Sequence, residues 1–116
     1  MMKNWVQLIG NLGADPELFQ FESGKRKVQF NLATNEWYRN QDQELVEETN
    51  WHKVIAWDNL ADQVMEALQK GEKVLIQGKL TSRSYEDKEG VKRSVTEVSL
   101  RDFEKITREK AVVAEN

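Results

Sequence analysis

Apolar and polar residues alternate along several short segments of the chain, which is the pattern of β-strands with one buried face. The first such segments are residues 4–12, 17–22 and 27–34. In the last of these, Val28, Phe30 and Leu32 fall on one side of the predicted strand. We therefore expect the chain to begin as a β-sheet.

A polar segment without periodicity follows over residues 35–48 and predicts a long loop. Loops of this length between strands often carry function. The stretch Thr49–Trp57, TNWHKVIAW, then alternates again and predicts the third main strand.

One helix is predicted over residues 59–70, because apolar residues recur there at helical spacing. These residues are Leu60, Ala61, Val64, Met65 and Leu68. Asp58 is a good candidate for the N-cap, Asp62 lies in the first turn, and Gly71 is placed to end the helix after Lys70.

Two further strands complete the pattern, over residues 72–87 and 91–106, joined by a turn over residues 86–90. Gly78, in the middle of the first, predicts a bulge or bend of the kind that closes barrels.

This order of elements is typical of an all-β OB-fold, a five-stranded Greek-key barrel with one helix between strands 3 and 4. The pattern leaves a small SH3-like barrel or a split α+β sheet as alternatives. We expect one domain over residues 1–106 and a short C-terminal tail over residues 107–116, which has little to bury.

The composition narrows the classes of function. The 116 residues carry a net charge of −3, one histidine and no cysteine, so they offer neither a thiolate or histidine metal cluster nor a recognisable nucleophile–base pair. We expect a binding protein without metal or cofactor rather than an enzyme. No segment is apolar enough to cross a membrane or to direct export, and a cysteine-free chain fits a reducing cytoplasm.

Tryptophan is unusually frequent, with four in this short chain: Trp5, Trp37, Trp51 and Trp57. Alternation within TNWHKVIAW places Trp51, Lys53 and Trp57 on one side of the strand, opposite the side that suits a barrel core. Core packing of Trp51 or Trp57 remains an alternative at this point.

Other aromatic and basic residues extend this predicted face. They are Trp37, Tyr38 and Arg39 in the polar loop, Lys79, Arg83 and Tyr85 in the next strand, and Lys92 and Arg93 across its turn. Aromatic rings stack on any exposed base and cations neutralise phosphates, so the set suits single-stranded nucleic acid. Sugars also stack on aromatic rings, and the pattern alone does not choose between these ligands.

Several motifs in order resemble the bacterial single-stranded DNA-binding protein family, from about Trp5 to about Val98. The chain carries VQLIGNLGADPEL, then FNLAT, EETNWHKVIAW, NLADQVMEALQKGEKVLIQGKL and SRSYEDKEGVKRSVTEV, at the spacing of the family. The resemblance implies an OB-fold, a cytoplasmic homotetramer, and sequence-tolerant binding of single-stranded DNA in replication, repair and recombination, without catalysis.

The resemblance also assigns expected roles to residues. Stacking carries over onto Tyr38, Trp51, Trp57 and Tyr85, with Trp37 as a neighbouring candidate, and phosphate contacts onto Lys53, Lys70 and Arg83. His52 matches a position near the family's subunit interface. Trp5 departs from the family's usual small or basic residue, and we expect it at an interface rather than on the binding face.

The family usually continues into a Gly/Pro/Gln-rich linker and an acidic tip that docks partner proteins. Neither is present in this sequence, which puts recruitment of replication and repair proteins in doubt. Two other hypotheses stay open: a subunit of a primosome-type assembly similar to primosomal replication protein N, and a small hydrolase or saccharide binder on the same barrel.

Overall fold

The computed structural model describes residues 3–107, and most of them belong to strands. The elements in order are β1 (Val6–Leu12), β2 (Glu17–Gln20), β3 (Arg26–Arg39), β4 (Leu45–Trp57), α1 (Asp58–Ala67), β5 (Lys73–Glu86) and β6 (Lys92–Ile106). The predicted tail lies outside the described residues, apart from Thr107. Within the described part of the chain, no helix has the length and apolar character that a bilayer crossing needs.

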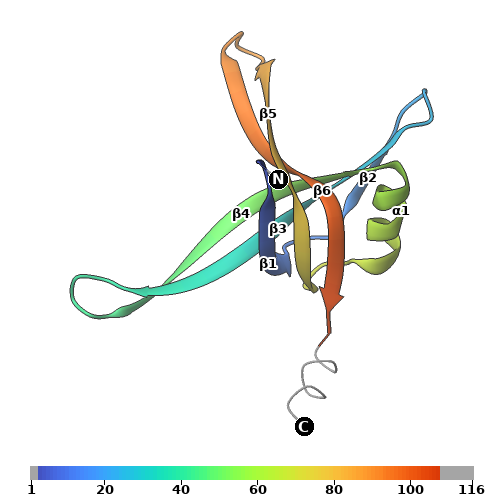
Figure 1. The fold of residues 1–116 in the computed structure, drawn as a ribbon. Coiled ribbons are helices and arrows are strands. Elements are labelled where there is room, and N and C mark those ends of the chain that lie inside the picture. The colour runs from blue at the N-terminus through green and yellow to red at the C-terminus, as the bar shows by residue number, and fades with distance from the viewer. Residues whose placement is uncertain (1–2, 108–116) are drawn as a thin grey trace.

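Five strands close into a barrel in the order β1-β5-β6-β4-β3, and β3 returns to β1. All of these pairings are antiparallel except β4 with β6, which run parallel where Val54 lies opposite Val98. Strand β2 adds to the outer edge of β3. The predicted OB-fold is confirmed: α1 lies between the third and fourth barrel strands, at one side of the barrel (Figure 1).

The core confirms the period-2 reading of the sequence. The buried residues come from the inward positions of the five barrel strands, from one side of α1 and from the residue just after it: Leu12, Val28, Phe30, Leu32, Val54, Ala56, Ala61, Val64, Leu68, Val74, Ile76, Val98 and Leu100. Burial of these apolar side chains supplies the main favourable free energy of folding.

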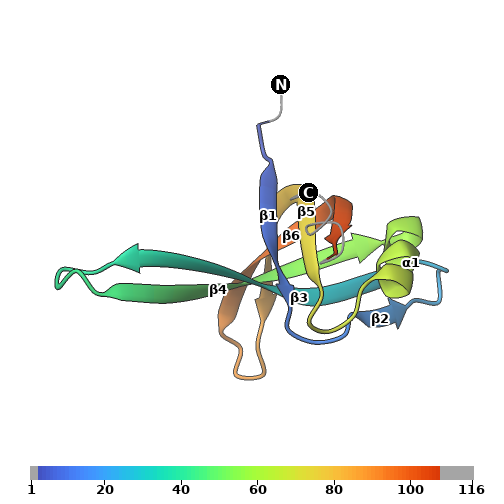
Figure 2. The same ribbon diagram turned by 90° about the horizontal axis from the view of Figure 1, so that it is seen from below.

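The predicted bulge at Gly78 is confirmed, because the register of β5 against β6 shifts between Gln77 and Gly78. A side chain at Gly78 would collide with the backbone oxygen of Ser99, so the two strands cross here with no room for a Cβ. Beyond the bulge, β5 and β6 leave the barrel together as a hairpin (Figures 1 and 2).

The prediction of a loop over residues 35–48 is mostly wrong. Strands β3 and β4 stay paired from Lys27–Trp57 out to Arg39–Leu45, so only residues 40–44 turn. The outer parts of β3 and β4 form a two-stranded ribbon that projects from the barrel in both views (Figures 1 and 2). The projecting ribbon has no buried face, so its sequence shows no apolar–polar alternation.

Both predicted ends of the helix are also corrected. Trp57, not Asp58, occupies the N-cap position, and α1 has no side-chain cap. The Asp58 carboxylate instead accepts a hydrogen bond from the backbone N–H of Arg26 on β3. The helix ends at Ala67, and Gly71, with φ of 86°, donates its N–H to the carbonyl of Leu12 rather than capping the helix.

Candidate functional site

The candidate site is the outer side of β3, β4, β5 and β6, which we call the aromatic face. It is defined by Trp51, Lys53 and Trp57 on β4 together with Arg83 on β5 and Glu97 on β6. These elements converge because β4 pairs with β6, and β6 pairs with β5.

The two tryptophans of β4 point away from the core, as the alternation predicts. Trp51 is 61% exposed and Trp57 is 43% exposed, whereas Val54 and Ala56 on the other side are fully buried. Ile55 shares the side of the tryptophans but is buried, because the β5–β6 hairpin lies beside it. The core-packing alternative for the two rings is therefore wrong.

Trp51 rests against the turn that follows β1. A Cβ on Gly13 would lie 2.5 Å from the edge of the indole ring, so the absence of a side chain at this position makes room for the ring. The Gly13 N–H is itself fixed by a hydrogen bond to the carbonyl of Asn31 on β3. This arrangement fixes one side of the Trp51 ring and leaves the other side to the surface.

Glu97 is the acidic centre of the aromatic face and was not predicted. Its side chain is buried, and it pairs with Lys53 and Arg83, two of the three cations expected to contact phosphates. Arg83 Nε donates to Glu97 Oε1 at 3.2 Å. Lys53 Nζ lies 3.3 Å from Oε2, as an ion pair without the directional geometry of a hydrogen bond.

Burial disfavours the charged form of Glu97 and would by itself raise its pKa. The hydrogen bond from Arg83 and the ion pair with Lys53 outweigh this effect, and the pKa of Glu97 lies below its ordinary value. Glu97 is therefore ionised at neutral pH, and the face holds two cations around one anion.

A hollow of about 410 Å³ opens beside Trp57 on this face. Its walls come from four strands, and they combine a ring, hydroxyl groups and charges: Lys27, Ile55, Trp57, Thr81, Ser82, Arg83, Glu97 and Ser99. A flat, polar-edged ring such as a nucleobase suits such walls in size and chemistry.

Strand β5 carries the aromatic face outward along its hairpin. The guanidinium of Arg83 lies 5.8 Å from the centre of the Tyr85 ring, and Tyr85 is exposed as predicted. At the tip, Arg93 is paired with Asp87, whose carboxylate also accepts two backbone N–H groups of the turn. Arg93 thus has a structural partner, while Lys79 and Lys92 are exposed.

The register of β3 against β4 places Trp37 and Tyr38 on opposite sides of the ribbon. Trp37 lies opposite Glu47 and follows Trp51 along one side of the ribbon, whereas Tyr38 lies on the side of His52. Both rings are exposed. The ribbon therefore presents one aromatic ring on each side, and Trp37 is the one in line with the aromatic face.

Three other predicted residues lie elsewhere. His52 points to the opposite side from the tryptophans, and its Nε2 lies 2.9 Å from the hydroxyl of Thr34. Trp5 is exposed just before β1. Lys70 belongs to none of the strands of the aromatic face: it lies between α1 and β5, with its N–H bonded to Asp15.

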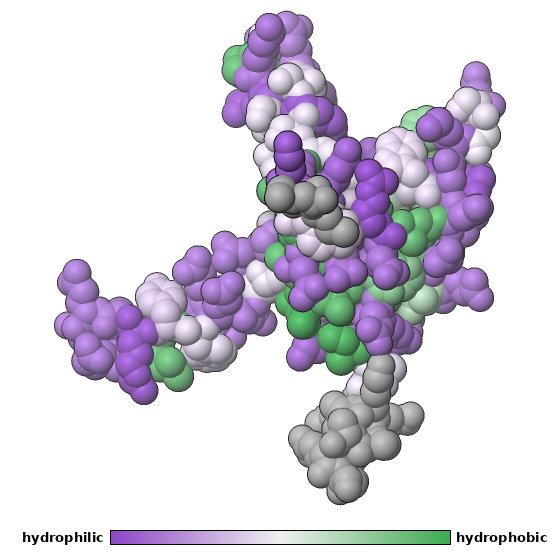
Figure 3. Space-filling model, viewed as in Figure 1, coloured by the Kyte–Doolittle hydropathy of each residue, from purple (hydrophilic) through white to green (hydrophobic). Residues whose placement is uncertain are grey.

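The chemistry of the surface agrees with this geometry. In Figure 3, hydrophilic residues cover the two projecting hairpins and pale residues of intermediate hydropathy interrupt them, while hydrophobic residues gather on the barrel. No group of three or more metal-ligating side chains is present within residues 3–107.

Comparison with known proteins decides the family. The model of the single-strand binding protein family matches residues 3–106. The chain belongs to this family. A family member from Chlorobaculum tepidum, named single-stranded DNA-binding protein 1, is 43% identical over 102 residues, which are 87% of this chain and 63% of that protein. The protein of the same name from Xylella fastidiosa is 40% identical, over 87% of this chain and 75% of its own.

A solved structure described as a Plasmodium falciparum SSB complex with ssDNA has the same fold. It superposes with a TM-score of 0.84 at 30% identity, covering 92% of this chain and 97% of that one. This chain thus spans a little less than two thirds of its Chlorobaculum relative and almost the whole of this structural neighbour.

Proposed function

We propose that this chain binds single-stranded DNA without reading its sequence. The observation that carries the proposal is the pair of exposed tryptophans, Trp51 and Trp57, on one side of β4 with Lys53 between them. Exposed rings of this kind stack on any base, at about 1–3 kcal/mol for each base. Membership of the family and the names of the relatives support the same ligand.

In this proposal the bases stack on Trp51 and Trp57, and the strand continues toward Tyr85 on one hairpin and Trp37 on the other. Lys53 and Arg83 contact phosphates by exchanging Glu97 for a phosphate oxygen. Tyr38 and Lys70 contact parts of the strand that leave the aromatic face.

The net charge of −3 affects how strongly the affinity for single-stranded DNA depends on salt concentration. Affinity falls with rising salt because phosphate contacts release counterions. Stacking is insensitive to this release, so it carries a larger share here than it would in a strongly basic protein.

We further propose that the chain acts as a homotetramer in the cytoplasm, during replication, repair and recombination, and that it binds without catalysing a reaction. Its resemblance to the family supports this assembly. His52 and Trp5 are the residues we assign to contacts between copies.

The test is a titration of intrinsic tryptophan fluorescence with poly(dT) at several salt concentrations, with the mass in solution measured in parallel. We expect strong quenching, a negative salt dependence and the mass of four chains. Absence of quenching at low salt would refute DNA binding, and the mass of a dimer would refute the tetramer.

A further inference from the structure

A second group of aromatic and basic side chains lies on the β2–β3 hairpin, next to Trp57. It consists of Phe19 on β2, Phe21 and Lys25 in the turn, and Lys27 on β3, and we call it the hairpin cluster. None of these residues belongs to the site predicted from the sequence.

The cluster is continuous with the aromatic face because of the sheet register. Lys27 lies opposite Phe19 on β2 and opposite Trp57 on β4, so these three side chains form one row across three strands. The Phe21 ring stacks on Trp57, with 6.3 Å between ring centres and 26° between planes.

Both cations of the cluster lie over rings. Lys25 Nζ is 5.5 Å from the centre of the Trp57 ring, and Lys27 Nζ is 5.7 Å from that of Phe19. Such contacts keep each ammonium group near a ring face, where a base that stacks on the ring brings its phosphate within reach.

The rings are exposed although phenylalanine usually contributes to a core. Phe19 is 40% exposed and Phe21 is 48% exposed. Glu17 and Glu22 flank them in sequence, so attraction for a polyanion here rests on stacking more than on net charge.

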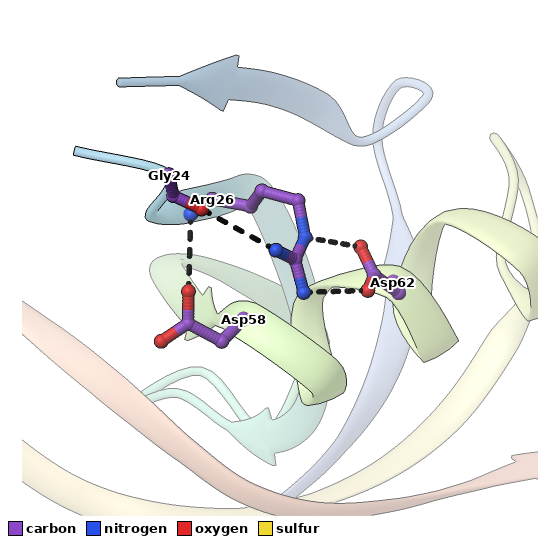
Figure 4. A network of polar contacts seen from close by, with 4 residues as sticks. All are labelled: Gly24, Arg26, Asp58 and Asp62. Carbon is purple, nitrogen blue, oxygen red and sulfur yellow. Dashed lines mark hydrogen bonds and ion pairs between the residues drawn. The ribbon is translucent and has the colours of Figure 1, made fainter. Parts of the chain in front are cut away.

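The hairpin that carries the cluster is fixed to the helix (Figure 4). The Arg26 backbone N–H donates to Asp58, and its guanidinium donates to both carboxylate oxygens of Asp62 at 2.9 and 2.8 Å. Arg26 also reaches the carbonyl of Gly24 in the turn. The hairpin that carries Phe19 and Phe21 is therefore held in one arrangement by Arg26, which lowers the entropy that binding must remove.

We propose that the hairpin cluster is an additional stacking subsite for single-stranded DNA, which extends the path beyond Trp57 onto β2. The proposal rests on the proposed function, because the same strand that stacks on Trp51 and Trp57 continues onto Phe21 and Phe19. Continuity with the aromatic face and the two ring-bound lysines favour nucleic acid over a protein partner.

The experiment measures the affinity of the full chain for oligo(dT) of increasing length, using Phe19→Ala and the matched control Leu18→Ala. Leu18 is on the same strand and equally exposed, but points to the opposite side. Loss of one stacked base predicts an affinity about 5- to 140-fold weaker for Phe19→Ala on long oligonucleotides, with little change on the shortest ones that bind. Leu18→Ala should bind like the wild type.

Two further variants separate stacking from folding. Phe19→Leu keeps an apolar side chain without a flat ring and should lose affinity like Phe19→Ala, whereas Phe19→Tyr should retain it. Circular dichroism and thermal unfolding show that each variant is folded.

An unchanged length dependence in Phe19→Leu, alongside weaker binding in Trp51→Ala, would overturn the subsite and leave the proposed function intact. A changed mass in solution without a change in affinity would make the cluster a contact between copies. If the wild type binds no oligonucleotide, both proposals fail together.

Discussion

Lys53 Nζ lies 3.3 Å from Oε2 of Glu97, so the cation between the two exposed tryptophans has an acidic partner within the protein. The same carboxylate accepts a hydrogen bond from Arg83. Any phosphate that binds Lys53 and Arg83 competes with Glu97 for them, and this competition makes Glu97 a determinant of affinity.

Glu97→Gln is expected to strengthen binding to single-stranded DNA severalfold at low salt, because Lys53 and Arg83 no longer lose an ion pair. The dependence of affinity on salt should become steeper, since more positive charge is available to phosphates. Titrations at several salt concentrations measure both effects. Glu36→Gln, which removes one charge on the opposite side of the ribbon, is the control and should have a smaller effect. Weaker binding by Glu97→Gln would mean that Glu97 positions the cations productively.

Glu97→Gln is also expected to lower the free energy of unfolding by about 1–3 kcal/mol at neutral pH, as for other buried groups that lose a charged partner. The pKa of Glu97 is lower in the folded protein than its ordinary value of 4.5, so its ion pairs stabilise the fold above that pH. This stabilisation is lost as the pH falls through the lowered pKa. Denaturant unfolding of both proteins from pH 7 to pH 3 should show their difference shrinking toward acid; a constant difference would exclude an ionic origin.

Trp51→Ala should weaken binding by about 1–3 kcal/mol while the fold persists, because the ring is exposed and stacks on a base in the proposed complex. Fluorescence anisotropy of labelled oligo(dT) measures the affinity. Ile9→Ala removes another exposed apolar side chain, on β1, and should leave affinity unchanged. Equal losses in the two variants would argue against a specific role for the ring.

Gly13→Ala should also weaken binding, through Trp51. A methyl group at position 13 would overlap the indole ring and displace it from its place on the face. We expect near-native stability with reduced affinity, and a shifted Trp51 signal in fluorescence spectra. In a Trp51→Ala background the same substitution should have no further effect on affinity, and an additive loss would contradict this route.

Trp37→Ala should weaken binding to long oligonucleotides more than Tyr38→Ala does, because only Trp37 lies on the side of Trp51. The affinities of the two single variants test this directly. The family resemblance favours Tyr38 as the stacking ring, so either result identifies which of the two rings contacts DNA. A larger effect of Tyr38→Ala would show that the DNA strand crosses to the other side of the ribbon.

The barrel was predictable from the sequence because its strands bury one side each. The alternation of Val28, Phe30 and Leu32 predicts the buried side of β3, and Gly78 predicts the bulge. The same rule placed Trp51 and Trp57 on the side opposite the core but left their packing open, and the structure exposes both rings.

Other features were not predictable, because they depend on contacts between distant segments. Nothing local shows that Glu97 meets Lys53, which requires the parallel pairing of β4 with β6. Asp58 resembles a helix cap, but its carboxylate bonds to the start of β3 instead. Nothing in the short segment over residues 17–22 distinguishes Phe19, and only the register reveals its place beside Lys27.

The β3–β4 ribbon has a kinetic consequence. The five residues of β3 beyond its last buried position, Thr34, at about 3.3 Å each, extend it roughly 17 Å from the barrel. A flexible polymer that diffuses past meets this arm, with Trp37 on it, before it meets the barrel. For the proposed binding of single-stranded DNA, the arm would enlarge the target for a first encounter, and capture at its end would turn a search through solution into a short local search for the Trp51 and Trp57 rings.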